Sequence, residues 1–156
     1  MTLDARRAGD ALATAAVDLA RVWRAGRAAA RPDVFPGLLD GVIESFMHTA
    51  GELMAGGRDP ALVWPATAGV VRVPRDARRA REELDAEWDL VEEVLTSALR
   101  ALQAGDAAVE WVTRAVVIGR AAMRTIGRAG GPPGVLAVAL RSDPAATRRG
   151  RAGGPR

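Results

Sequence analysis

The stretch RDARRAREELDAEWDLVEEVLTSALRALQ, residues 75–103, indicates the fold class of this chain of 156 residues. Its apolar residues recur three and four positions apart, which is the period of an α-helix with one buried face. Gly105 is typical of the end of a helix, and Asp106 is typical of the cap of the next one. The predicted apolar stripe consists of Ala77, Ala80, Leu84, Trp88, Val91, Val94, Leu95, Ala98, Leu99 and Leu102.

Helical patterns of similar length lie on both sides of this stretch. One follows it at residues 107–127, and two precede it at residues 3–30 and 36–55. Each is bounded by Gly or Pro, which end or begin helices. Four long helices with short connections pack most simply as an antiparallel bundle. We therefore predict an all-α fold over residues 1–128: an antiparallel bundle of four long helices plus one short helix.

The short helix is predicted between the second and third long ones. Asp59 is a suitable cap and Pro60 a suitable first residue, and residues 62–64 are apolar. The run GVVRVP, residues 69–74, fits either a last helical turn or an extended connector. We expect the short helix to lie across an end or a side of the bundle.

Charge is distributed unevenly between the helical part and the tail. Residues 1–128 contain 17 Arg and 18 acidic residues, whereas residues 129–156 contain five Arg and one Asp. All 22 basic residues are Arg, which is typical of a chain encoded by a GC-rich bacterial genome, so richness in Arg is not by itself evidence for nucleic-acid binding. Cys is absent, which excludes disulfides and thiolate chemistry. The sequence shows neither a signal peptide nor a membrane-spanning apolar run, and we expect a cytoplasmic protein.

The C-terminal region, residues 129–156, is predicted to be a disordered tail because it consists largely of Gly, Pro, Ala and Arg. It contains one apolar run, residues 135–140, directly after a linker rich in Gly and Pro. This run is either a tethered docking peptide for a partner protein or a segment that folds back over an open end of the bundle. The partner-binding candidates here are Val135, Leu136, Val138, Leu140 and Arg141.

The second predicted helix has a polar side that is another candidate for partner binding. Gly37 and Gly41 lie on that side, where the missing side chains let another helix approach closely. His48 lies there too, with Glu44 and Glu52 four positions away in each direction. The helical wheel directs these three side chains towards solvent or a partner, and we therefore predict no metal site.

No residue pattern in the chain points to catalysis. The serines lack the context of a nucleophile, and no Gly-rich loop opens a helix as a phosphate site does. Seven acidic residues crowd the third long helix, and we expect them to form its solvated face. We therefore expect neither enzymatic activity nor a cofactor. The seven are Glu82, Glu83, Asp85, Glu87, Asp89, Glu92 and Glu93.

Two segments resemble a family of bacterial regulators. Leu38-Leu39-Asp40-Gly41-Val42, then Arg72, then REELDAEWDLVEEVL at residues 81–95 look like the helical N-terminal domain of stress-response co-antagonists and related sensor histidine kinases. That domain carries a Leu-Leu-acidic helix, an Arg, and a helix reading roughly Leu-x-x-Glu-aromatic-x-Leu-Leu-Arg. Here Glu92 or Glu93 stands where the family has its last Arg, and no output domain follows. The resemblance implies a regulatory module that contacts partner proteins and has no enzymatic activity.

These observations lead to one preferred function and two alternatives. We predict a non-enzymatic regulatory or sensory protein-interaction module in bacterial signalling, whose partner is a kinase, an anti-sigma-type regulator or a second copy of the chain. The first alternative is a helical bundle that binds a small molecule or cofactor beside its four tryptophans, although we expect these to pack in the core. The second is a cargo or adaptor protein. Residues 136–141, LAVALR, loosely resemble the peptides that load cargo into bacterial encapsulin shells, but they lack the Gly-Ser pair of those peptides. We expect no membrane and no nucleic-acid partner.

Overall fold

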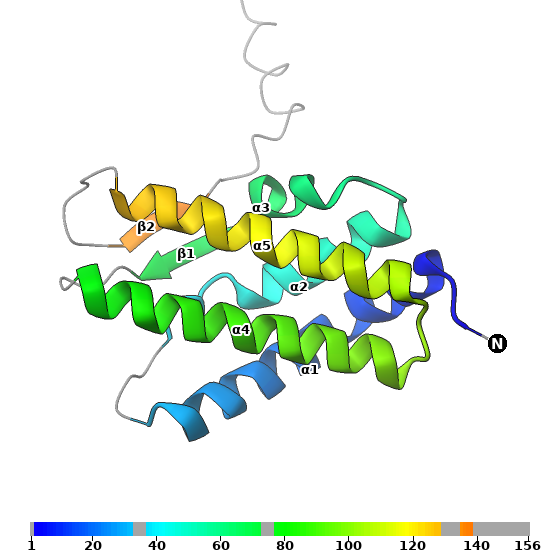
Figure 1. Cartoon of the computed structure of the whole chain (residues 1–156), viewed down its shortest axis with the longest axis horizontal. Helices are drawn as coiled ribbons and strands as arrows, with labels where there is room; N and C mark the ends of the chain where they lie inside the picture. The colour runs from blue at the N-terminus through cyan, green and yellow to red at the C-terminus, as the bar shows by residue number, and fades with distance from the viewer. Residues whose placement is uncertain (1, 33–36, 73–76, 129–134, 139–156) are drawn as a thin grey trace, which may run out of the picture.

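The computed structural model describes residues 2–32, 37–72, 77–128 and 135–138, and most of these residues are helical. The elements in chain order are α1 (Ala5–Ala30), α2 (Ile43–Ala55), the 3-10 helix η1 (Pro60–Leu62), α3 (Val63–Ala66), β1 (Gly69–Arg72), α4 (Ala77–Ala101), α5 (Asp106–Arg128) and β2 (Val135–Val138). The helices pack along one another, and the two strands lie towards the end of the molecule where α4 begins and α5 ends (Figure 1).

The prediction of a mostly helical chain is confirmed. α1, α4 and α5 have 26, 25 and 23 residues, whereas α2 has 13. The finer prediction, an antiparallel bundle of four long helices, is not confirmed. Within the described part of the chain, none of the helices combines the length and the hydropathy that a membrane span requires. The predicted tail beyond residue 138 lies outside the described residues.

α2 begins at Ile43, later than the sequence pattern predicts. The residues before it form turns, in which the carbonyl oxygen of Leu39 accepts hydrogen bonds from the amides of Val42 and Ile43, both at 2.9 Å. The amides of Leu38 and Leu39 donate to a side chain of α4 instead of entering a helix. Gly37 also disfavours an earlier start of α2, because Gly lowers the stability of a helix.

β1 lies between β2 and the turn that precedes α2. On one side it pairs with β2, antiparallel. On the other side Gly41 forms an antiparallel bridge with Val70, and the amide of Arg72 donates to the carbonyl oxygen of Leu38 at 3.1 Å. The run GVVRVP, residues 69–74, is thus an extended strand over its first four residues. Within the apolar run of residues 135–140, Val135–Val138 fold back and pair with it. The register pairs Gly69 with Val138, Val70 with Ala137, Val71 with Leu136 and Arg72 with Val135.

α1 and α2 approach each other most closely at two glycines. A Cβ atom on Gly51 of α2 would overlap the backbone of Ala13 in α1, and a Cβ atom on Gly9 of α1 would overlap the backbone of Ala55. Two helix backbones come this near only where neither carries a side chain. The pair of glycines therefore sets the distance between α1 and α2.

The aromatic side chains form the centre of the core. Trp88 of α4 is 1% exposed, and its ring meets the rings of Phe46 and Trp64 edge-on, with centroids 5.1 and 5.7 Å away. The expectation that tryptophans pack in the core is confirmed for Trp23, Trp64 and Trp88, whereas Trp111 is half-buried.

Candidate functional site

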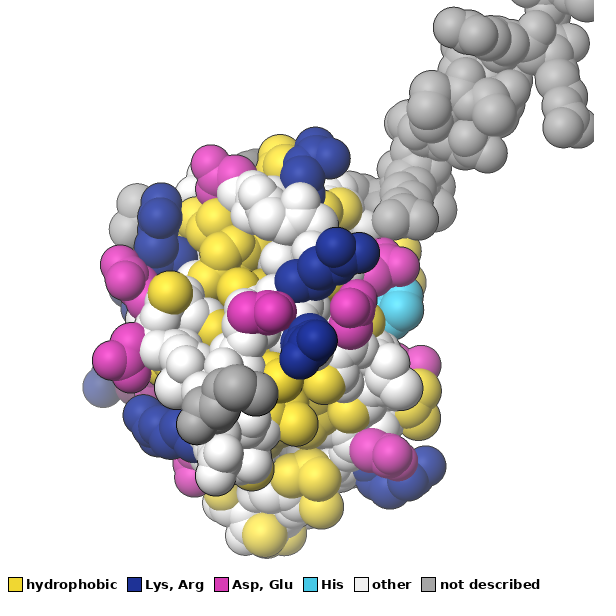
Figure 2. Space-filling model, turned by 90° about the vertical axis from the view of Figure 1, so that its right-hand side faces the viewer, with side chains coloured by type: hydrophobic (Ala, Val, Ile, Leu, Met, Phe, Trp, Pro, Cys, Tyr) yellow, Lys and Arg dark blue, Asp and Glu magenta, His cyan; other side chains and the backbone are white. Residues whose placement is uncertain are grey.

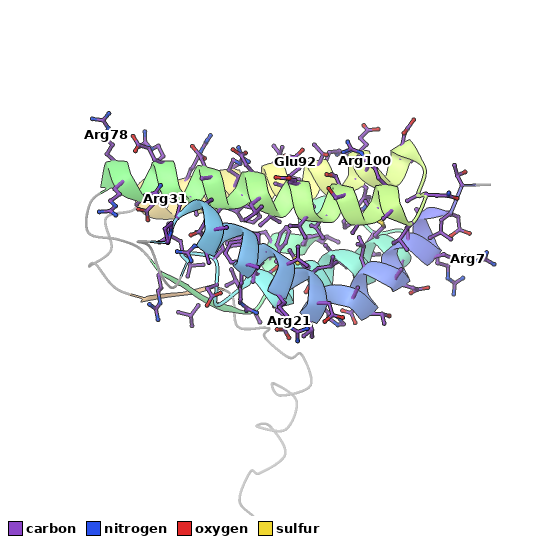
Figure 3. All side chains as sticks on the ribbon, turned by 90° about the horizontal axis from the view of Figure 1, so that it is seen from below. Arg7, Arg21, Arg31, Arg78, Glu92 and Arg100 are labelled. Carbon is purple, nitrogen blue, oxygen red and sulfur yellow. The ribbon has the colours of Figure 1, made fainter. Side chains whose placement is uncertain are left out.

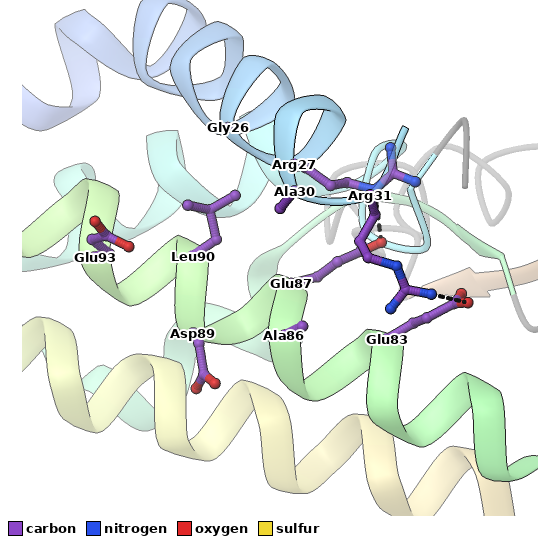
Figure 4. Close-up of a pocket in the computed structure, with 10 residues that line it drawn as sticks. All are labelled: Gly26, Arg27, Ala30, Arg31, Glu83, Ala86, Glu87, Asp89, Leu90 and Glu93. Carbon is purple, nitrogen blue, oxygen red and sulfur yellow. Dashed lines mark hydrogen bonds and ion pairs between the residues drawn. The ribbon is translucent and has the colours of Figure 1, made fainter. Parts of the chain in front are cut away.

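A buried ion pair joins α1 to α4. Arg27 follows Ala20 and Trp23 on the buried stripe of α1, and its Nε donates to Oε1 of Glu87 at 3.0 Å. Each side chain is only 5% exposed. The two come from facing helices and meet between them (Figure 4). Charged groups are buried at this depth only when other groups pair with them, so the pair marks a place where the tertiary structure supplies specific partners.

The carboxylate of Glu87 also holds the turn that precedes α2. Its Oε1 accepts a hydrogen bond from the amide of Leu38 at 2.9 Å, and its Oε2 accepts one from the amide of Leu39 at 2.8 Å. Gly37 is buried beside the side chains of Arg27 and Glu87, which leave no room for a Cβ atom. The carboxylate therefore connects α4 to α1 and to the turn at the same time.

Burial raises the pKa of Glu87 above its ordinary value. Loss of hydration is the largest cause, and the hydrogen bonds from the amides of Leu39 and Leu38 and from Arg27 act in the opposite direction, together with the positive charge of Arg27. Two further charged side chains lie nearby: Glu83, one turn earlier on α4, and its partner Arg31 at the end of α1. The site thus contains a carboxyl group whose protonation lies closer to neutral pH than usual.

We expect the unfolding free energy to fall as the pH rises through the window between the ordinary pKa of Glu87 and its raised pKa. In that window the folded chain holds a proton that the unfolded chain has released, so deprotonation favours unfolding. Glu87→Gln cannot ionise and should lack this part of the pH dependence. Guanidinium unfolding followed by circular dichroism at a series of pH values measures the difference, and equal slopes in the two proteins would contradict the prediction.

A second buried carboxylate lies one turn earlier on α4. Glu83 accepts hydrogen bonds from Nη2 of Arg31 at 3.3 Å and from Nε of Arg79 at 2.8 Å. Figure 3 shows Arg31 at the end of α1, beside the first turns of α4. The prediction that the acidic residues of this helix form a solvated face is therefore wrong for Glu83 and Glu87, which are 5% and 4% exposed. The reason is that α1 brings two arginines to them.

A groove of about 300 Å³ runs between α1 and α4 beside these ion pairs (Figure 4). Its charged wall is formed mostly by the two pairs, Arg27 with Glu87 and Arg31 with Glu83. Asp89, also in its lining, is bound by an arginine of α5. The remaining lining residues are Gly26, Ala30, Ala86, Leu90 and Glu93.

The backbone of β1 directs alternate residues to its two sides. The amide of Arg72 faces Leu38, and amide and carbonyl groups alternate in direction along a strand. Val71 and Gly69 therefore direct their backbone groups towards β2. This edge of β1 offers two residues for pairing with another strand.

β2 occupies that edge through the matching backbone groups. Leu136 lies opposite Val71 and Val138 opposite Gly69, so their amides face β1, whereas the amide of Ala137 faces away from it. The main contact of β2 with the other described elements is the one with β1. The attachment of β2 therefore depends on a short backbone ladder.

The predicted partner-binding residues other than His48 fall into three groups. Val135, Leu136 and Val138 are residues of β2, while Leu140 and Arg141 lie outside the described residues. The prediction that Gly37 and Gly41 lie on the polar side of the second helix is wrong, because α2 begins only at Ile43. A close approach does occur at both glycines. It is made by groups of the same chain, because Gly37 faces the buried ion pair and Gly41 lies against the backbone of Val70.

His48 occupies the exposed position that its place on the helix predicts. Its side chain is 51% exposed, and its Nε2 lies 3.2 Å from Oε1 of Glu52. Its Nδ1 lies 3.2 Å from the carbonyl oxygen of Ala13, and Figure 2 shows the ring at the surface. In the described ranges, no three side chains of ligating type come together as a metal site. A role of His48 in partner binding stays a prediction.

Known proteins do not guide the assignment. No protein-family model matches the sequence, and searches of curated proteins and solved structures gave no match either. The resemblance to the N-terminal domain of bacterial regulators therefore stays a prediction. The β1 edge and the Arg27–Glu87 pair are the features of the described residues on which a function can be based.

Proposed function

We propose that this chain is a non-enzymatic, regulatory protein-interaction module that binds its partner by strand exchange at β1. In this proposal the helices form an antiparallel scaffold, and β1 offers an edge that either β2 or a strand of the partner occupies. The observation that supports it most directly is the pairing of Val135–Val138 with β1, from which these residues are separated by two long helices in the sequence.

Strand pairing explains how such a module binds and releases a partner. Main-chain hydrogen bonds provide the affinity, and alternate side chains provide the specificity. A pair of short strands is only marginally stable by itself, so a competing strand can replace β2 at low cost. Once displaced, the apolar run of residues 135–140 is available for docking on the partner. We expect the partner to be a protein with an extended, uncharged apolar segment, because β2 itself has the sequence VLAV.

The groove between α1 and α4 is the feature that favours the alternative function, binding of a small molecule. A ligand site needs a few polar groups that are available to orient the ligand. Here Arg27 and Arg31 already bind Glu87 and Glu83. The β1 edge therefore supports a function better than the groove does.

We expect the full chain with Leu136→Pro to bind a labelled peptide of residues 131–145 about tenfold more tightly than the unsubstituted chain. In the unsubstituted chain β2 occupies the edge, and the apparent affinity falls in proportion to the fraction of chains whose edge is free. Proline at position 136 removes the amide that faces Val71. The chain's own strand then leaves β1, and the edge becomes free for the peptide. Fluorescence anisotropy of the labelled peptide measures the binding.

Ala137→Pro is the matched control. The amide at this position faces away from β1, where strands tolerate proline, so binding should equal that of the unsubstituted chain. Circular dichroism shows whether each variant keeps its helices. The proposed function is wrong if the Leu136→Pro chain is helical and still does not bind the peptide.

A further inference from the structure

We infer that Glu87 is a positioning residue for the β1 edge and acts on that edge through the turn of residues 37–41. This inference rests on the proposed function, because it states what holds the strand-accepting edge in place. Leu38 forms the link. Its amide donates to Oε1 of Glu87 at 2.9 Å, and its carbonyl oxygen accepts from the amide of Arg72 in β1 at 3.1 Å.

Further contacts make the turn the support of β1. Gly41 bridges Val70, whose carbonyl oxygen leaves no room for a Cβ atom on Gly41. A Cβ atom on Gly69, which has φ 138°, would overlap the carbonyl oxygen of Gly41. From α1, Nε of Arg24 donates to Oδ1 of Asp40 in the same turn at 2.7 Å. The turn is therefore fixed by α1 and α4, and β1 is attached to the turn.

The charge of Glu87 matters because three donors converge on its two oxygens. Arg27 Nε and the amides of Leu38 and Leu39 all donate to this carboxylate. An ionised carboxylate only accepts hydrogen bonds, whereas a protonated carboxyl or an amide side chain also carries a donor. Neutralising the group therefore places a donor against a donor and removes at least one of the three bonds.

Glu83 provides a comparison within the same helix. It is as buried as Glu87, but its Oε1 accepts hydrogen bonds from Arg31 and Arg79. Among the described residues 37–41, none donates a hydrogen bond to Glu83. Glu83→Gln should therefore remove a buried charge, as Glu87→Gln does, but leave the position of the turn unchanged.

The inference is tested by amide hydrogen exchange, measured by NMR on the full chain without any peptide. In Glu87→Gln, the amides of Leu39 and Arg72 should exchange about tenfold faster than in the unsubstituted chain, the effect expected for the loss of one hydrogen bond to a charged group. The amide of Val112 in α5 should be unchanged. In Glu83→Gln, all of these rates should stay within about twofold, as expected where no hydrogen bond of the turn is lost.

Equal acceleration in both variants, or none in Glu87→Gln, would overturn the inference. If Glu87→Gln does not fold, the unsubstituted chain provides the test. The amide shifts of Leu38 and Leu39 should then follow the carboxyl carbon shift of Glu87 with one midpoint as the pH falls, and independent midpoints would overturn it. These readouts are separate from peptide binding. A chain that binds no peptide but shows the Glu87 effect disproves the function alone, and the reverse result disproves only the inference.

Discussion

Gly51→Ala is expected to lower the free energy of unfolding by about 3 kcal/mol, at the upper end of what overpacking costs in a protein core. The added Cβ atom would overlap the backbone nitrogen and Cα of Ala13 and lie against the carbonyl oxygen of Gly9. These are backbone atoms of α1, so they cannot move aside as a flexible side chain does. α1 and α2 must separate along their contact, which loosens the packing on both sides of it.

The direction of this effect is informative because helix propensity predicts the opposite. Ala in the interior of a helix is favoured over Gly by about 1 kcal/mol, so any loss of stability must come from the tertiary contact. Gly105→Ala is the control, since a Cβ atom at that position meets no other atom within 4 Å. It should change the unfolding free energy by less than about 0.5 kcal/mol. Chemical denaturation followed by circular dichroism measures both variants, and a Gly51→Ala chain that is as stable as the parent contradicts the glycine contact.

Trp88→Ala is expected to lower the unfolding free energy by about 3–5 kcal/mol, the range found for truncation of a large buried aromatic residue. Trp88 is 1% exposed and contacts two other rings, Phe46 and Trp64. The six-membered ring of its indole also lies against Gly119 of α5. Removal of the indole therefore leaves a cavity where α4 meets both α2 and α5.

Trp111→Ala is the comparison for this variant. Trp111 is half-buried, and its Nε1 donates to the carbonyl oxygen of Arg58 at 2.9 Å. The loss should be about 1 kcal/mol, as for one hydrogen bond and partial burial. Circular dichroism is the suitable probe because it does not depend on the tryptophans. Equal losses in the two variants would show that Trp88 is not the centre of the core.

The periodicity of the sequence predicts the positions of most helices but not the exact orientation of each. The stripe of α4 is buried at Leu84, Trp88 and Leu95 as predicted, whereas Val22 of α1 is 57% exposed although it is apolar and precedes the buried Trp23. The buried row of α1 passes through Ala20, Trp23 and Arg27 instead. A charged residue in line with a buried stripe was the available signal for the ion pair. This signal was not decisive, because Arg27 would also fit on a wide polar face of α1.

The buried carboxylates show why the candidate site could not be predicted. Glu83 and Glu87 belong to an acidic run whose residues are mostly solvated in proteins. Their burial is acceptable only because α1 supplies two arginines and the turn before α2 supplies two backbone amides. Those groups lie tens of residues away in the sequence. Local periodicity carries no information about them.

The sequence by itself determined that the chain is mostly helical and that helices stop at Gly and Pro, because these features depend on residues within a few positions of one another. The tertiary structure alone decided the late start of α2, the burial of Arg27 with Glu87, and the pairing of β2 with β1. In each of these cases a backbone or charged group has its partner in a distant part of the chain. Such a partner becomes available only when the helices pack and exclude water from the groups between them.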